Sequence, residues 1–165
     1  KVQFYKLRPP NFPTIRLSQL AQLYEQRTNL FSLVIAAKTR DQVQELFKIE
    51  TSFYWETQYY FGKIHKKRSK KITPAFIDIL IINTLTPIKF ATAKAQGQLK
   101  EVELVKLMLN LPQEKNSMMN CFSKSRETKK DALHSQALIQ LKKMYCDQNQ
   151  CLHCQIRNYL LNEAI

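Results

Sequence analysis

Three cysteines near the C-terminus have a spacing that suits a metal centre. Cys146, Cys151 and Cys154 follow the pattern C-x4-C-x2-C and lie between two predicted helices. A C-x2-C pair at a turn can place two thiolates on one zinc ion. The same order, completed by a distant fourth cysteine, is the spacing of a plant-type iron–sulfur cluster. The pattern indicates a zinc or iron–sulfur site, but buried packing and a disulfide are the alternatives.

Either centre needs a fourth ligand, and the sequence offers three candidates. Cys121 is the best local choice. His153 lies between two of the cysteines, where simultaneous ligation is awkward. His134 lies three helical turns before Cys146 and is distant unless the chain folds back.

A strongly basic segment, Gly62–Lys71, is the second candidate for chemistry, and we call it the basic loop. No acidic residue lies between Glu56 and Asp78. Such a segment could neutralise several phosphates and bind nucleic acid in a salt-sensitive way, or it could be a mobile, solvated loop with no partner. Its cations are Lys63, Lys66, Lys67, Arg68, Lys70 and Lys71.

An aromatic cluster directly precedes the basic loop. These rings could stack on nucleic-acid bases beside the basic loop. Clusters of this kind more often form part of a core, so the core interpretation is favoured unless several rings are exposed. The members are Phe53, Tyr54, Trp55, Tyr59, Tyr60 and Phe61.

A proline-rich turn precedes the first predicted helix. Prolines within 9–13 restrict the backbone, and Thr14 has the residue type of a helix cap. The helix should place Ile15 and the apolar residues up to Tyr24 near one face. Arg8 and Arg16 surround the turn, where they suit either an anion site at a helix start or an ordinary surface.

The segment 73–96 is the element around which the other helices should pack. Thr73 can cap it, Pro74 fits the first helical position, and Gly97 suits its end. Apolar residues cover nearly every face between 76 and 91, which is typical of a buried helix. Polar interruptions leave it short of the roughly 20 apolar residues that a bilayer requires. We expect a kink or break at Pro87 and no membrane span.

Composition bounds the class of protein. The chain has 165 residues, two glycines and a formal net charge of +13. We expect one all-α domain over 1–165, a multi-helix bundle around the central buried helix 73–96. Residues 1–13 should be an extended lead-in with a strand-like start, and the chain should belong to a longer cytoplasmic protein. The basic charge favours a nucleic-acid partner.

Several segments together resemble the C-terminal half of an uncharacterised bacterial family, a domain of unknown function. They include RPPNFPTIRLSQLAQL, FIDILIINTLTPIKFA, HSQALIQLK and YC-x4-CLHC-x-I. The resemblance extends over essentially the whole chain. Full-length members look restriction-endonuclease-like at the N-terminus, which implies a nuclease-like half as partner, in the same or a separate chain. Here Arg157 replaces a glycine of the family, and Cys121 is not a family position.

Two hypotheses follow for an otherwise unknown function. The first is a helical auxiliary module that binds nucleic acid through Arg8, Arg16 and the basic loop. The alternative is a structural or interaction domain with a cysteine-rich metal site and no nucleic-acid role. Catalysis by this chain alone is not expected, because its carboxylates are scattered and no H-E-x-x-H or phosphate-binding glycine loop occurs.

Overall fold

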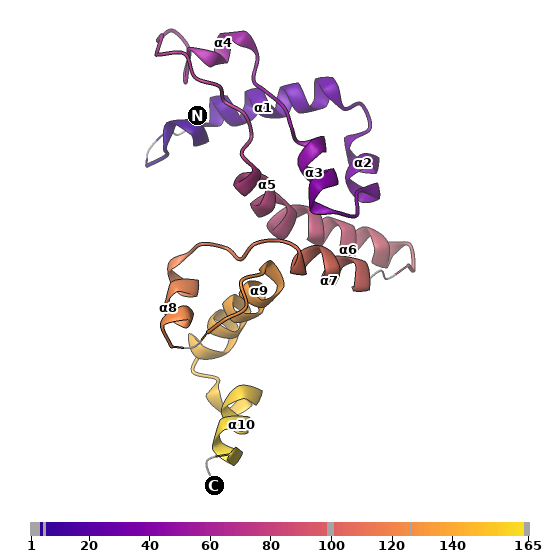
Figure 1. Cartoon of the computed structure of the whole chain (residues 1–165), viewed down its shortest axis with the longest axis vertical. Helices are drawn as coiled ribbons and strands as arrows, with labels where there is room; N and C mark the ends of the chain where they lie inside the picture. Colours follow the sequence, from indigo (N-terminus) through magenta and orange to yellow (C-terminus); the bar gives the residue numbers. More distant parts are fainter. Residues whose placement is uncertain (1–3, 5, 99–100, 126, 164–165) are drawn as a thin grey trace. The chain divides into compact units, whose positions relative to one another are not determined.

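The computed structural model describes residues 4, 6–98, 101–125 and 127–163, and these form helices without a β-strand (Figure 1). The all-α class predicted from the sequence is confirmed. Most of the strand-like start lies outside the described residues. The chain divides into two compact units, Lys1–Lys100 (unit 1) and Glu101–Ile165 (unit 2). The single domain and its lead-in over 1–13 stay predictions.

Unit 1 contains the central helix and the short helices around it. Its buried apolar residues include Ile15, Val43, Ile77 and Ile81. The elements are η1 (Pro9–Asn11), α1 (Pro13–Gln26), α2 (Leu30–Ala36), α3 (Arg40–Leu46), α4 (Phe53–Glu56), α5 (Pro74–Leu80), η2 (Ile81–Leu85) and α6 (Thr86–Ala95).

Both ends of the central helix follow from its sequence. The hydroxyl of Thr73 accepts a hydrogen bond from the backbone N–H of Phe76 at 3.3 Å, and Pro74 begins α5. At the other end Gly97 has a φ of +66°, which a side chain would disfavour. Its N–H bonds to the carbonyl of Lys94, and that of Gln98 bonds to Ala93. These two bonds form a Schellman motif, so the predicted cap and glycine stop are confirmed.

The helix adapts to Pro87 by widening instead of breaking. Residues Ile81–Leu85 form a π-helical turn, and the N–H of Thr86 bonds to the carbonyl of Ile81, five residues earlier. Proline has no N–H and its ring crowds the preceding turn, so a regular α-helix would be disrupted at this point. A π turn changes the hydrogen-bond ladder just before the proline. The predicted distortion is therefore present, and the chain continues into α6.

Two buried charged side chains anchor this helix to the rest of unit 1. Asp78 accepts two hydrogen bonds from the guanidinium of Arg40 on α3, at 2.7 and 2.8 Å. Lys89 donates to the carbonyls of Ile35 and Ala37 at the end of α2, at 2.8 and 2.6 Å. A lysine at a helix C-terminus satisfies carbonyls that have no partner within the helix. The central helix is thus held at two points along its length.

The helix Pro74–Ala95 has 22 residues and a mean hydropathy of 1.4, which is long and apolar enough to cross a membrane. The sequence predicts an apolar run too short for a span. A soluble core helix that passes the same test is mostly buried, whereas 28% of this segment is buried, so the helix is less buried than the sequence predicts. One such helix is weak evidence for a membrane span. Asp78 is paired with Arg40, and Lys89 is bonded to backbone carbonyls. Two such charged groups fit a helix that packs on protein, because they are costly in lipid. The cytoplasmic location stays a prediction.

Unit 2 is also helical. Leu107, Leu111 and Met119 are among its buried residues. The segments on either side of α8 meet where the N–H of Ala132 bonds to the carbonyl of Leu111 at 2.9 Å. The elements are α7 (Glu101–Leu109), α8 (Ser117–Ser125), α9 (Ala132–Leu141), η3 (Lys142–Cys146), η4 (Cys151–His153) and α10 (Gln155–Glu163).

Asp131 caps α9, and this gives a testable pH dependence. Burial by itself would raise the pKa of Asp131. Hydrogen bonds from the backbone and ring nitrogens of His134, with nearby positive charge, outweigh burial and hold the pKa below its ordinary value of 3.8. The folded state therefore favours the carboxylate. Its stabilisation should be complete above the unfolded-state pKa and be lost as the pH falls through the lower folded-state value.

An Asp131→Ala variant should unfold about 1 kcal/mol more easily at neutral pH, the usual cost of removing an N-cap. Urea denaturation at neutral pH and at a pH below 3.8 measures the difference between variant and wild type. The difference should shrink at the acid pH. An unchanged difference would contradict the assigned role of the carboxylate.

Candidate nucleic-acid interface

The basic loop is held in a defined conformation by its own backbone. Gly62 turns the chain with a φ of +82°, a conformation that favours glycine. Beyond the turn, residues Gln58 and Ile64 form an antiparallel bridge. The N–H of His65 bonds to the carbonyl of Thr57 at 2.7 Å, and that of Arg68 bonds to Glu56 at 2.9 Å. The loop therefore folds back along the segment that carries the aromatic residues.

A pocket with several basic side chains in its lining lies where the end of the basic loop meets the start of α1. Its volume is about 290 Å³. Four cations line it: Arg16 from α1, and Arg68, Lys70 and Lys71 from the basic loop. Asn11, Ser69 and Thr73 add side chains that can hydrogen-bond. The structure thus brings together the two basic regions that the sequence analysis singles out separately.

Arg16 is fixed in the wall of this pocket. Its guanidinium lies 3.6 Å from the ring centroid of Phe76 and donates to Gln19 and Asn11 at 2.9 and 2.6 Å. Partial burial lowers the pKa of Arg16, but a guanidinium remains protonated in proteins. The arrangement supplies an oriented positive charge with further N–H donors, which suits a phosphate.

Gln19 positions both sides of the pocket and was not foreseen from the sequence. It is buried, its carbonyl oxygen accepts from Arg16, and its amide nitrogen donates to the carbonyl of Lys70 at 2.8 Å. The signal was available: Ile15, Gln19 and Leu23 are spaced four residues apart and share the buried face of α1. A polar residue in the middle of that apolar face needs a partner.

The first residues of α1 differ from expectation. The helix begins at Pro13 with Phe12 as the N-cap residue, so the prediction of Thr14 as cap is wrong. The hydroxyl of Thr14 instead donates to the carbonyl of Tyr59, which ties α1 to the aromatic segment. This long-range bond competes successfully with the local capping bond.

Lys70 is buried, unlike the other cations of the basic loop. Its ammonium donates to the carbonyls of Trp55 and Gln58, the latter at 2.9 Å, and lies 4.2 Å from the ring centroid of Tyr59. Burial lowers the pKa of Lys70, against the opposing charge of Glu56. Lys70 therefore supports the aromatic segment from inside the unit and does not present its charge to a ligand.

The remaining cations fall into two groups. Lys67 pairs with Glu56 at 2.8 Å and Lys71 with Glu50 at 2.5 Å. The second group is exposed and forms no ion pair within the described part of the chain; we call these the four exposed cations. They are Arg8, Lys63, Lys66 and Arg68.

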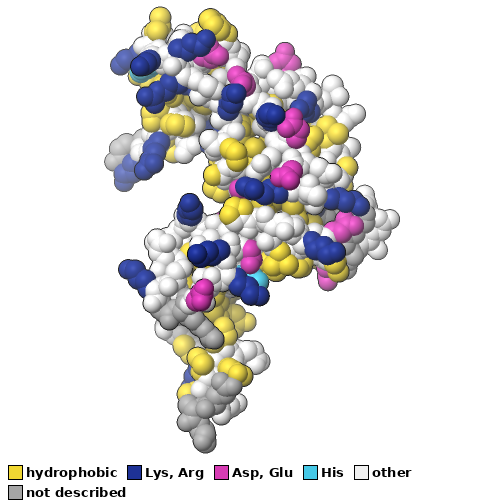
Figure 2. Space-filling view, viewed as in Figure 1, with side chains coloured by type: hydrophobic (Ala, Val, Ile, Leu, Met, Phe, Trp, Pro, Cys, Tyr) yellow, Lys and Arg dark blue, Asp and Glu magenta, His cyan; other side chains and the backbone are white. Residues whose placement is uncertain are grey.

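Several residues of the aromatic cluster are exposed, which bears on the prediction that the cluster forms part of the core. Phe53 is 78% exposed, Phe61 74% and Tyr54 41%. Hydrophobic and Lys/Arg side chains lie next to one another in Figure 2 over the region where Figure 1 places α4 and the loop after it. The favoured core interpretation is therefore wrong for these three rings.

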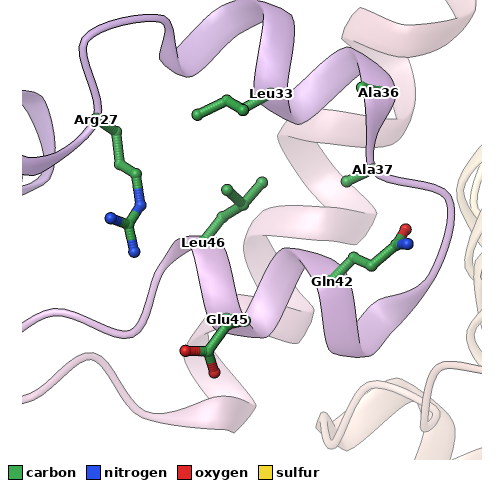
Figure 3. Close-up of a pocket in the computed structure, with 7 residues that line it drawn as sticks. All are labelled: Arg27, Leu33, Ala36, Ala37, Gln42, Glu45 and Leu46. Carbon is green, nitrogen blue, oxygen red and sulfur yellow. The ribbon is translucent and has the colours of Figure 1, made fainter.

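A second pocket in unit 1 is less suited to a polar ligand. It is open, has a volume of about 510 Å³, and is lined by Leu33, Leu46 and two alanines (Figure 3). Arg27 also lines it and donates to the carbonyl of Gln26 at 3.4 Å. The other two polar side chains are engaged elsewhere. Gln42 accepts hydrogen bonds from the N–H groups of residues 38 and 39 in the cap of α3, and Glu45 pairs with Lys48.

The cysteines of unit 2 all lie in the described part of the chain and form no disulfide there. Cys146 ends η3, Cys151 begins η4, and Cys154 follows it. The pKa of Lys142 is raised, chiefly by its hydrogen bond with Asp147, and in smaller part by the charges of Cys146 and Cys121. These two cysteines thus lie near one amine.

The four cysteines are not gathered into a ligand set. Among the described residues, no three His, Cys, Asp or Glu side chains are arranged to hold a metal ion. Of the other two candidate ligands, His134 bonds to Asp131 at 2.8 Å and His153 lies within η4. The zinc or iron–sulfur site with Cys121, Cys146, Cys151 and Cys154 stays a prediction.

Comparison with known proteins places the chain in a family. A family model described as "Protein of unknown function (DUF2851)" matches residues 1–117. The chain belongs to this family. The match contains all of unit 1 and ends before the cysteines, so it is shorter than the resemblance over the whole chain suggested. No curated protein and no solved structure gives a significant match. Membership of the DUF2851 family therefore assigns no activity.

Proposed function

We propose that unit 1 of this DUF2851 protein is a nucleic-acid-binding module. The observation that carries the proposal is the convergence of Arg16, Arg68 and Lys71 on one pocket, together with the other exposed cations Arg8, Lys63 and Lys66. Guanidinium and ammonium groups donate hydrogen bonds to phosphate oxygens, and the local excess of positive charge attracts the negative phosphates. Contacts of this kind fix the position of a strand without reading its sequence.

Cations that contact the ligand differ from the residues that hold the site together. Arg8, Lys63, Lys66 and Arg68 have charges available for phosphates. Lys70 and Gln19 position the basic loop against α1 through the bonds described above. Binding should therefore depend on the first group directly and on the second group through folding of the loop.

A pair of charge-matched variants tests this assignment. In the first, the four exposed cations are replaced by glutamine. In the second, four exposed lysines of unit 2 are replaced in the same way, so that both variants lower the net charge of +13 by four. Fluorescence anisotropy with labelled DNA and RNA should show weaker binding for the first variant only. Equal binding by both would overturn the proposal. The lysines of the control are Lys106, Lys124, Lys130 and Lys143.

In the longer proteins of the family, this module would accompany the restriction-endonuclease-like half that the resemblance implies. The module would then hold nucleic acid while the other half supplies a metal-dependent nuclease centre. The chain itself has the role of a binding module and not of an enzyme. This relation to a nuclease rests on the resemblance alone.

An apolar stripe on α1 favours a second function, the packing of unit 1 on another protein surface. The sequence predicts that Leu17, Leu20 and Tyr24 share the buried face of Ile15. This prediction is wrong, because they are 59%, 47% and 62% exposed. Their spacing places them along one side of the helix. Apolar side chains gathered in this way are typical of protein–protein contacts.

Tyr24 provides a direct test of this second function. Hydroxyl-radical footprinting should modify Tyr24 strongly in the isolated chain and several-fold less in a longer protein that carries the nuclease-like half. Phe31, which is 61% exposed on α2, serves as the reference residue. Equal modification of Tyr24 in both proteins would exclude the stripe as that interface.

A further inference from the structure

Three of the rings beside the basic loop contact one another, and a fourth precedes them in the chain. Tyr54 lies edge-on to Trp55 with 5.0 Å between ring centroids, and Phe61 lies 5.2 Å from Trp55 and 6.1 Å from Tyr54. Phe53 precedes them on α4, with the ammonium of Lys67 5.4 Å from its centroid. We call these four residues the aromatic platform.

The platform exposes more apolar surface than folding requires. Phe53 and Phe61 are about three-quarters exposed, and Ile64, across the turn from the platform, is 79% exposed. Exposed apolar groups scattered singly are normal, but contiguous ones mark a binding surface. Trp55 is half-buried and makes edge-on contacts with the rings of Tyr54 and Phe61. The platform is therefore supported by the fold and open on its outer side.

The charges around the platform select the kind of ligand. Lys63 lies between Phe61 and Ile64 in the chain, Lys67 lies over Phe53, and Lys66 is between them in sequence. Glu56, at the end of α4, pairs with Lys67, and no acidic residue occurs from 57 to 77. A ligand that covers this surface must offer flat apolar faces and negative charge together. Nucleic acid has both, since its bases carry the faces and its backbone carries the charge.

We infer that the ligand of unit 1 is single-stranded nucleic acid whose bases stack on Phe53 and Phe61. This inference rests on the proposed function and adds the form of the ligand. Base faces inside a duplex are covered by their neighbours, so exposed rings cannot reach them without unstacking. In a single strand the faces are free, and aromatic stacking tolerates any base. Recognition should therefore be independent of sequence but dependent on the presence of bases.

The platform contains its own reporter. Trp55 is the only tryptophan of the chain, so its emission reports on this site alone. A base stacked on Phe61, whose ring centroid is 5.2 Å from that of Trp55, should change the emission of the indole. A strand held only through its phosphates should leave it unchanged. The fluorescence thus distinguishes stacking from charge attraction.

The experiment uses the full chain and three labelled ligands of equal length. They are oligothymidylate spanning the ~4–16 nucleotides of a typical single-strand site, an abasic strand with the same phosphates, and a duplex. The wild type should bind oligothymidylate most tightly, and only this ligand should quench Trp55. Phe53→Ala and Phe61→Ala should each weaken its binding about tenfold, because a stacked base contributes that much, and leave abasic binding unchanged.

Two further variants keep the inference falsifiable. Phe31→Ala removes an exposed ring (61%) from α2 and should change nothing, whereas Phe61→Tyr retains a flat ring and should bind like the wild type. Equal affinity for the abasic strand and oligothymidylate, or tighter binding of the duplex, would overturn the inference while leaving the proposed function intact. Absence of binding to all three ligands would overturn both.

Discussion

The variant in which Arg8, Lys63, Lys66 and Arg68 are replaced by glutamine should lose most of the salt dependence of nucleic-acid binding. Each phosphate neutralised by a cation releases counterions, so the logarithm of the affinity falls with the logarithm of the salt concentration. For single strands the slope is about −0.7 per contact, and four lost contacts should reduce its magnitude by about 3. Between about 50 and 200 mM salt, the wild type should therefore lose about fiftyfold more affinity than the variant.

Anisotropy titrations at four or five salt concentrations measure both slopes. The unit 2 control, with Lys106, Lys124, Lys130 and Lys143 replaced, carries the same change in net charge and should keep the wild-type slope. A parallel shift of both variants would mean that the chain attracts polyanions through its total charge alone. In that case the basic loop would have no special part in binding.

The Asp78→Ala variant should have the largest effect on folding. The carboxylate of Asp78 is 7% exposed and meets the guanidinium of Arg40, which is 33% exposed, in a two-bond arrangement. Removing one partner of a buried pair leaves the other charge without compensation, at a cost of about 3 kcal/mol when that charge is partly solvated. The loss should appear as a lower urea midpoint at unchanged m-value.

Two controls separate this pair from charge effects in general. The pair of Lys48 with Glu45 is exposed on both sides, so Lys48→Ala should leave stability close to that of the wild type. The double variant Arg40→Met, Asp78→Leu removes both charges and should recover much of the loss, because apolar replacements of a buried pair are tolerated. If Asp78→Ala lowered the free energy of unfolding by less than about 1 kcal/mol, the pair would contribute no more than an ordinary surface ion pair.

Features specified within a few residues of sequence were predicted correctly. Thr73 and Pro74 define the start of the central helix, Gly97 defines its end, and Pro87 distorts it. Each of these depends on backbone groups at most five residues away. The all-α class follows in the same way, since it requires only helical periodicity and few turn residues.

Features that depend on distant partners were not predictable. Thr14 has the residue type of a cap, but a carbonyl 45 residues later takes its hydroxyl. Lys70 looks like the other cations of its segment, yet it alone turns inward to the carbonyls of Trp55 and Gln58. Arg16, Arg68 and Lys71 line one pocket only because the basic loop packs on α1. No local sequence pattern predicts this packing. Composition located the cations, and only the fold distinguishes their roles.

The π turn at Ile81–Leu85 sets the rotational phase between the two anchors of the central helix. Asp78 precedes the turn and Lys89 follows it, so the turn fixes the angle between the side chain that meets Arg40 and the one that meets the end of α2. Removing one residue within 81–85 would rotate everything beyond it by about 100° about the helix axis. One anchor would then face away from its partner. In this segment the number of residues matters more than their identity, and single-residue insertions or deletions there should be far less tolerated than substitutions at exposed positions.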